Sequence, residues 1–135
     1  MRFVLDCSVT MPWLLKNEPT GYAEKILKHL EKGEALVPFL WHLEVGNVLL
    51  SAERRKRLLE AESERFLHWL SELPVTVDSQ PPAMALSRVV SLGREQNLSS
   101  YDAAYLELAM REGTSLATVD KGLIQAAKKV GIPLA

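Results

Sequence analysis

Short apolar runs alternate along the chain with longer stretches in which apolar residues recur at helical spacing. The short runs predict buried strands at Arg2–Leu5, Ala35–Val37, Pro74–Val77 and Ser115–Thr118. The longer stretches predict helices over 20–32, 41–57, 60–73, 82–97, 99–113 and 121–130. Gly131–Leu134 is a candidate for a further, short edge strand. Because strands alternate with helices, we expect a three-layer α/β/α domain around a mainly parallel sheet of four or five strands.

Residues at the boundaries and on the faces of the predicted helices support these elements. Thr20 is the expected N-cap of the first long helix, and Gly33 follows that helix as a stop signal. The helix over 41–57 has one apolar face, formed by Trp41, Val45, Val48, Leu49 and Ala52. The helix over 60–73 has an apolar stripe of Phe66, Leu67, Leu70 and Leu73.

Composition narrows the class of protein. A chain of 135 residues, 47% of them hydrophobic, has the length of one domain, and we expect a single domain over 1–135. Without an uncharged apolar run of about 18 residues, no membrane-spanning helix is expected. Cys7 is the only cysteine, so an internal disulfide cannot form and a cytoplasmic location fits. The 16 Lys+Arg against 17 Asp+Glu give a net charge of −1, which taken alone argues against a nucleic-acid partner.

Acidic residues occupy positions where ligands bind in parallel sheets. Asp6 and Asp120 directly follow two predicted strands, and the carboxyl ends of parallel strands meet at one edge of the sheet. Asp102 shares a helical stripe with Leu106 and Ala109, the face expected to pack inward.

A fourth acid lies beside the apolar face of the helix predicted over 41–57. Glu44 borders the apolar face of this helix, with Asn47 one turn along on the same side.

Two interpretations of these acids are open. In the first, Asp6 and Asp120 cap the helices that follow them, and Asp102 completes a capping box that begins at Ser99. In the second, the four acids meet at the sheet edge, where their repulsion requires a divalent cation. Oxygen ligands without Cys or His favour Mg²⁺ or Mn²⁺, and Mg²⁺ is usually shared with substrate phosphates, which indicates chemistry at a phosphate ester.

Four blocks of the sequence resemble the PIN-domain ribonucleases, and in particular the VapC-type toxins of bacterial and archaeal toxin–antitoxin pairs. The blocks occur in the family's order and at its separations, and they are Val4–Val9, Leu43–Asn47, Leu98–Ala109 and Leu116–Leu123. Cys7 is a small departure, because Thr or Ala is more usual at that position.

The resemblance implies a site and a reaction. The acidic pocket would consist of Asp6, Glu44, Asp102 and Asp120, of which Asp6, Asp102 and Asp120 would contact the metal. Ser8 and Thr118 would orient the carboxylates, and Asn47 would do the same for Glu44. The reaction implied is Mg²⁺-assisted hydrolysis of RNA phosphodiester bonds. The implied partners are a cognate antitoxin and a second copy of the chain, with Leu40, Trp41 and Leu50 as candidate contacts.

Other sequence signals and competing functions differ in the residues that they require. The basic run Arg54–Arg57 is either a solvated helix end or a contact for the RNA backbone. A dehalogenase-type phosphatase requires a second Asp where Ser8 stands, and a receiver domain requires an acidic pair before its nucleophile. The remaining alternative is a non-catalytic or other phosphate-ester domain in which the acids only cap helices.

Overall fold

Four parallel strands form one sheet in the order β3-β2-β1-β4. The computed structural model describes residues 1–15 and 21–135. In the register of the sheet, Val4 of β1 pairs with Leu36 of β2 on one side and with Leu116 of β4 on the other. The strands are β1 (Arg2–Leu5), β2 (Glu34–Pro38), β3 (Val75–Asp78) and β4 (Ser115–Ala117).

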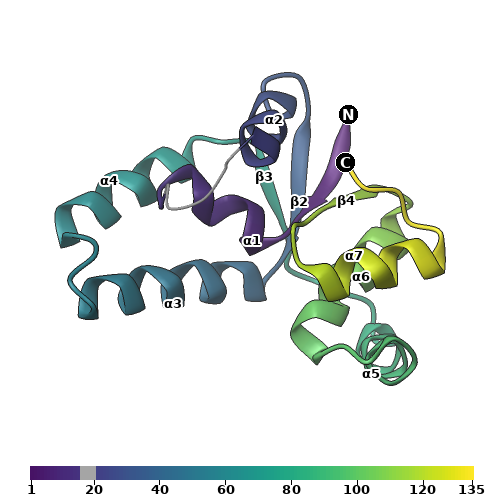
Figure 1. Ribbon diagram of the computed structural model, residues 1–135. Coiled ribbons are helices and arrows are strands. Elements are labelled where there is room, and N and C mark those ends of the chain that lie inside the picture. Colours follow the sequence, from purple (N-terminus) through teal and green to yellow (C-terminus); the bar gives the residue numbers. More distant parts are fainter. Residues whose placement is uncertain (16–20) are drawn as a thin grey trace.

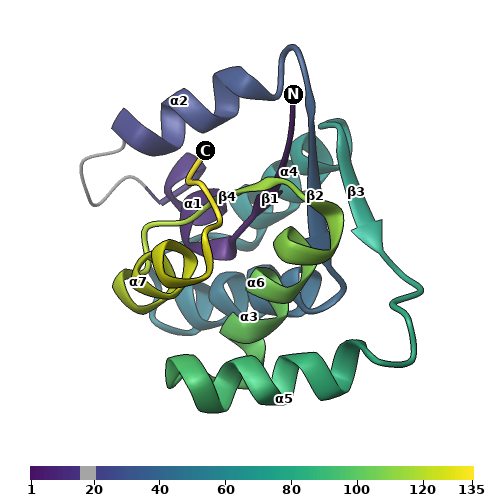
Figure 2. The same cartoon turned by 90° about the vertical axis from the view of Figure 1, so that its right-hand side faces the viewer.

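Helices cover both faces of the sheet. In Figure 1, α1, α3 and α4 lie on one side of the strands and α5, α6 and α7 on the other; Figure 2 shows the second group in front of the strands and the first behind. The predicted three-layer architecture is confirmed. The helices are α1 (Cys7–Thr10), the 3-10 helix η1 (Met11–Trp13), α2 (Gly21–His29), α3 (Leu40–Arg54), α4 (Glu60–Ser71), α5 (Ala85–Gln96), α6 (Ser100–Glu112) and α7 (Lys121–Val130).

The core is built around β1 and α6. Phe3, Val4 and Leu5 are fully buried, as a strand covered on both faces requires. Helix α6 contacts three of the four strands and is buried on most of its circumference, with Tyr105 as its largest fully buried side chain. Of the helices in the described ranges, none is long and apolar enough to cross a membrane.

Several helix and strand boundaries differ from the prediction. Helix α3 ends at Arg54 because Lys56 adopts a left-handed conformation (φ 58°) and the Arg57 amide returns to the Ala52 carbonyl. The segment expected to form a fifth strand contributes only one bridge, between Leu134 and Leu116. Thr20, the expected cap of α2, lies outside the described residues.

Three side chains play roles other than those expected. Helix α2 ends at His29, so Gly33 does not stop it; a Cβ at Gly33 would lie 2.0 Å from the Met1 carbonyl oxygen. Leu67 is 41% exposed because it lies off the buried face of α4. Trp41 is buried, with its indole N–H donating to Thr10 Oγ1, so it is a core residue rather than a free contact surface.

Candidate active site

Asp6 stands at the carboxyl end of β1, with its side chain held by two hydroxyl groups. Its backbone amide continues the pairing with β4 by donating to the Ala117 carbonyl at 3.0 Å. Ser8 Oγ donates to Asp6 Oδ2 at 2.6 Å, and Thr118 Oγ1 donates to the same oxygen at 2.7 Å. Asp6 makes no side-chain cap to α1. Asp6, the N-cap residue of α1, is only 5% exposed, and its two hydroxyl donors give its carboxylate partners that helix capping does not require.

Asp120 stands beyond the end of β4 and does cap a helix. Its Oδ2 accepts a hydrogen bond from the Leu123 amide at 2.9 Å, which stabilises the first turn of α7. The Asp120 amide in turn donates to Thr118 Oγ1 at 3.1 Å, and the Val119 amide donates to Ser8 Oγ at 3.2 Å. The hydroxyls that hold Asp6 therefore also fix the backbone that leads to Asp120.

Glu44 reaches the same region from the second turn of α3. Its Oε1 accepts a hydrogen bond of 2.5 Å from the hydroxyl of Tyr105, a residue of α6. Between the described side chains of Asn47 and Glu44 there is no hydrogen bond, and Asn47 is exposed beside Val48 and Ser51. The sequence analysis missed Tyr105, although its position three residues after Asp102 was a usable signal because it places both side chains on one face of α6.

Asp102 is half-buried in the first turn of α6. Its backbone amide donates to Ser99 Oγ at 3.1 Å, so the serine caps the helix and the aspartate side chain remains available. Leu106 and Ala109, which share its stripe, are fully buried, as expected for the inward face of α6.

The four acids influence one another electrostatically. Burial raises the pKa of Asp6, and the charge of Asp120 adds to this effect, while hydrogen bonds from Ser8 and Thr118 oppose it. Burial also raises the pKa of Asp102, and the charges of Asp120 and Asp6 raise it further. For Glu44, burial raises the pKa, the Tyr105 hydrogen bond opposes the rise, and Asp6 and Asp102 add to it. The structure thus brings four carboxylates into one electrostatic neighbourhood.

The chemistry of these side chains fits a hard divalent cation. The donors are carboxylate and hydroxyl oxygens, which Mg²⁺ and Mn²⁺ prefer to nitrogen or sulfur ligands. Across residues 1–15 and 21–135, no three Asp, Glu, His or Cys side chains form a group spaced to hold a metal ion. A cation shared by these acids would therefore require their side chains to draw together, against their mutual repulsion.

The burial of these carboxylates, with their mutual repulsion as a smaller cause, predicts how the stability of the metal-free protein depends on pH. The pKa values of Asp6, Glu44 and Asp102 lie above their ordinary values, so the folded state binds protons more tightly than the unfolded state does. Stability should rise as pH falls from 7 through these raised pKa values, and the gain is complete below the unfolded values near 4. We expect the unfolding temperature to rise over this range. The rise should be smaller in Asp102→Asn; an equal rise in that variant would contradict this origin.

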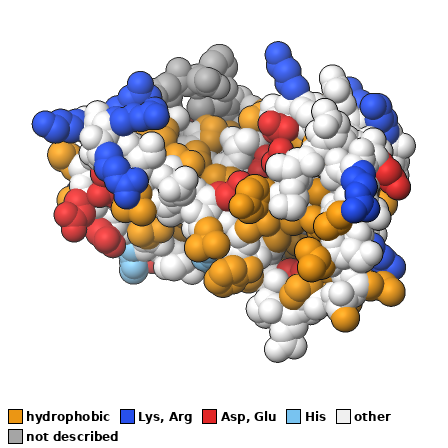
Figure 3. Space-filling model, turned by 90° about the horizontal axis from the view of Figure 1, so that it is seen from below, with side chains coloured by type: hydrophobic (Ala, Val, Ile, Leu, Met, Phe, Trp, Pro, Cys, Tyr) orange, Lys and Arg blue, Asp and Glu red, His pale blue; other side chains and the backbone are white. Residues whose placement is uncertain are grey.

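The surroundings of the acids are mixed in charge. Seen from below, one group of acidic side chains lies near the middle of the face, while Lys and Arg side chains and further acidic ones lie towards its margins (Figure 3). Arg55 and Arg57 line a pocket of about 250 Å³ together with Asn47 and Ser51. Part of the basic run is therefore grouped beside the exposed side of α3, the helix that carries Glu44.

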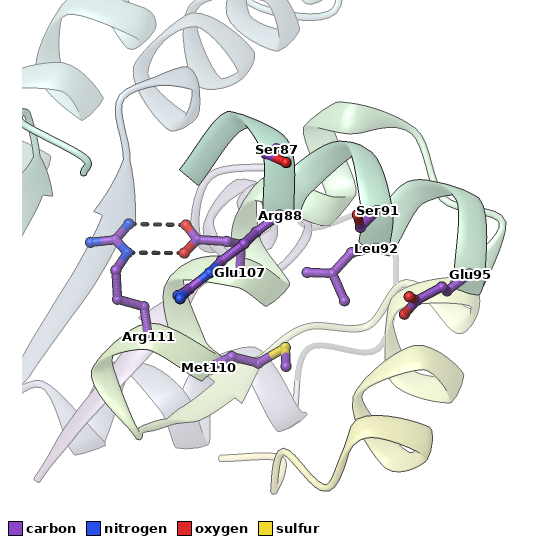
Figure 4. A pocket seen from close by; sticks show the side chains of 8 residues that line it. All are labelled: Ser87, Arg88, Ser91, Leu92, Glu95, Glu107, Met110 and Arg111. Carbon is purple, nitrogen blue, oxygen red and sulfur yellow. Dashed lines mark hydrogen bonds and ion pairs between the residues drawn. The ribbon is translucent and has the colours of Figure 1, made fainter. Parts of the chain in front are cut away.

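A separate pocket of about 380 Å³ lies between α5 and α6. Figure 4 shows the Arg111 guanidinium turned towards Glu107 there; Arg111 Nη2 also donates to Asp78 Oδ2 at 2.7 Å. None of the four site acids lines this pocket, so its ion pairs are a feature of the scaffold. The lining residues are Ser87, Arg88, Ser91, Leu92, Glu95, Glu107, Met110 and Arg111.

Comparison with known proteins agrees with the fold and with the sequence blocks. The family model described as PIN domain matches residues 3–129, and the chain belongs to this family. It is 29% identical over 125 residues to Ribonuclease VapC3 of Pyrobaculum aerophilum, an alignment that covers 93% of this chain and 94% of that protein. The family predicted from the four blocks is confirmed.

Solved structures are similar over nearly the whole chain. The crystal structure of PAE2754 from Pyrobaculum aerophilum has a TM-score of 0.69 at 28% identity, covering 93% of this chain and 87% of that one. VapBC2 from Rickettsia felis, bound to a DNA fragment from its promoter, has a TM-score of 0.71 at 12% identity, covering 100% of this chain and 98% of that one. VapBC-1 from nontypeable Haemophilus influenzae has a TM-score of 0.67 at 18% identity, covering 100% of this chain and 97% of that one. For VapBC2 and VapBC-1, at 12% and 18% identity, the similarity shows the fold alone.

Proposed function

We propose that this protein is an Mg²⁺-dependent endoribonuclease and the toxin of a type II toxin–antitoxin pair. One observation carries the proposal: a buried Asp6 carboxylate, held by Ser8 and Thr118, lies among three further acids at the carboxyl edge of a parallel sheet. A carboxylate that only capped a helix would not require two side-chain hydroxyl donors and three acidic neighbours. The name of the ribonuclease relative gives independent support.

In the proposed site, Asp6, Asp102 and Asp120 hold the metal, and Glu44 completes the acidic pocket. When bound, Mg²⁺ supplies a Lewis acid that favours ionisation of water and offsets charge on the phosphate. Thr118 Oγ1 donates to Asp6 and accepts from the Asp120 amide, so one side chain sets the relative position of two carboxylates. Ser8 donates to the same Asp6 oxygen as Thr118, and the two hydroxyl oxygens lie 3.4 Å apart. Asp120 can serve as both cap and ligand because its cap bond uses only Oδ2.

The basic residues beside α3 are proposed to contact the RNA backbone. Arg55 lies 11 residues after Glu44, just past the end of α3. At 1.5 Å per residue, this separation corresponds to about 16 Å along the helix axis. Arg55 and Arg57 are exposed, and within the described chain no ion pair occupies either guanidinium. Arg55 and Arg57 would therefore be available to bind phosphates on one side of the cleaved bond. The net charge of −1 does not reveal this local basic group, because it sums over the whole chain.

A second copy of the chain and an antitoxin are the proposed protein partners. Phe39, Leu43 and Leu50 are 60%, 65% and 49% exposed, and their spacing of four and seven residues places them on one face of α3. An exposed apolar stripe of this kind fits a self-complementary dimer contact. The toxin–antitoxin complexes among the similar structures support an antitoxin. A single domain over residues 1–135 and a cytoplasmic location complete the proposal.

Metal dependence tests the proposed function. Purified protein incubated with total RNA and Mg²⁺ should release fragments, whereas addition of a chelator should stop cleavage and excess Mg²⁺ should restore it. Gel electrophoresis of the RNA measures the outcome. Equal cleavage with and without chelator would contradict a metal-dependent reaction.

A further inference from the structure

The hydroxyl of Tyr105 faces a single polar side chain of the site. Tyr105 is fully buried, and its hydroxyl donates to Glu44 Oε1 at 2.5 Å. The two residues come from different helices: Glu44 lies on α3 and Tyr105 on α6, on opposite sides of the sheet. Because Asp102 lies one turn before Tyr105, this hydrogen bond connects the helix of Glu44 to the helix that carries Asp102.

The hydrogen bond has a fixed direction. Burial and the hydrogen bond to Glu44 hold the pKa of Tyr105 well above its usual range, so the phenol remains protonated and donates. Donation to Oε1 leaves Oε2 as the Glu44 oxygen without this partner, and it restrains the position of Oε1. Glu44 is only partly buried, so without this donor its side chain would be free to rotate.

We infer that Tyr105 is a positioning residue for Glu44, orienting one carboxylate oxygen towards the shared acidic site; this rests on the proposed ribonuclease function. Asn47, the residue expected to hold Glu44, lies exposed and does not contact it by a hydrogen bond in the described structure. Tyr105 acts through Glu44 and has no role in contacting RNA, because its side chain is inaccessible to solvent.

Tyr105→Phe tests this assignment because it removes only the hydroxyl and retains the ring. We expect kcat for RNA cleavage to fall about 10- to 100-fold, the usual range for groups that orient ligands at metal sites. The KM for RNA should stay within about twofold, because no substrate contact is lost. The same substitution in a Glu44→Gln background should have almost no further effect on kcat, because the tyrosine acts only through the carboxylate.

A matched control separates positioning from stability. Ser63 is also a buried hydroxyl that donates to a carboxylate, Glu53 Oε2 at 2.7 Å, but this pair lies outside the site. Ser63→Ala should leave kcat unchanged. Thermal unfolding of Tyr105→Phe and Glu44→Gln, singly and together without metal, should show coupling between the two residues, a readout that needs no activity.

The outcomes distinguish this inference from the function on which it rests. Cleavage by Tyr105→Phe at the rate of the unsubstituted protein overturns the assignment. It is also overturned if Tyr105→Phe lowers kcat as much in the Glu44→Gln background as in the unsubstituted protein. Failure of the unsubstituted protein to cleave RNA with Mg²⁺ overturns the proposed function itself. Coupling in unfolding together with the expected loss of kcat supports both.

Discussion

Asp6→Asn is expected to lower RNA cleavage more than about 100-fold while the protein stays folded. The substitution removes the negative charge from the most buried of the four acids. The resulting loss of activity should exceed the 10- to 100-fold loss that is typical when a group that only orients metal ligands is removed. An asparagine oxygen still accepts the hydroxyls of Ser8 and Thr118, so the local structure should persist. Cleavage rates and circular dichroism measure the two expectations.

The stability of this variant distinguishes a functional acid from a structural one. Because burial raises the pKa of Asp6, its charge destabilises the metal-free fold at neutral pH, and the unfolding temperature of Asp6→Asn should not fall. Glu95→Gln, which removes an exposed acid outside the site, should leave both cleavage and stability unchanged. A large loss of stability in Asp6→Asn with normal cleavage would show that Asp6 is structural.

Arg111→Met is expected to lower the free energy of unfolding by about 3 kcal/mol, the typical cost of removing one partner of a buried ion pair. Arg111 donates to Glu107 and Asp78, and the Glu107 side chain is only 5% exposed. Without the guanidinium, a buried carboxylate would lack its cation. The cluster also connects the end of β3 to α6, so its loss should weaken the attachment of the edge strand. Chemical denaturation measures the change.

Two further variants show whether burial causes this effect. Arg2→Met breaks the ion pair with Glu112, whose side chains are 43% and 35% exposed, and should cost less than about 1 kcal/mol. Arg111→Met leaves two carboxylates without their cation; adding Glu107→Leu removes the more buried of them, leaves Asp78 unpaired, and should recover part of the loss. A similar cost for Arg2→Met and Arg111→Met would contradict a special contribution from the buried pair.

The strands and the position of Asp6 could be predicted because both depend on local pattern. The apolar run of β1 ends at Asp6, and parallel pairing with β4 brings Thr118 beside it. The order of the strands was not predicted; it is the structure that places β1 beside β4 and so brings Thr118 to Asp6. The proximity of Ser8 to Asp6 likewise follows from their separation of two residues.

Features that depend on contacts between distant elements were not visible in the sequence. The spacing of Tyr105 from Asp102 indicates a shared face of α6, but that the Tyr105 hydroxyl meets Glu44 depends on how α3 and α6 are placed. The Arg111–Asp78 pair joins residues 33 positions apart, which no helical or strand period predicts. The early end of α3 depends on one backbone angle at Lys56, a residue that rarely adopts a positive φ.

Binding of Mn²⁺ to the metal-free protein tests the central claim most directly, because it requires no knowledge of the RNA target. Titration calorimetry on the unsubstituted protein, Asp6→Asn and the Glu95→Gln control should show saturable binding that only Asp6→Asn weakens, at least about 10-fold. Such a result would place the cation at the acids around Asp6. Equal Mn²⁺ affinity in all three proteins would contradict a metal site built on Asp6.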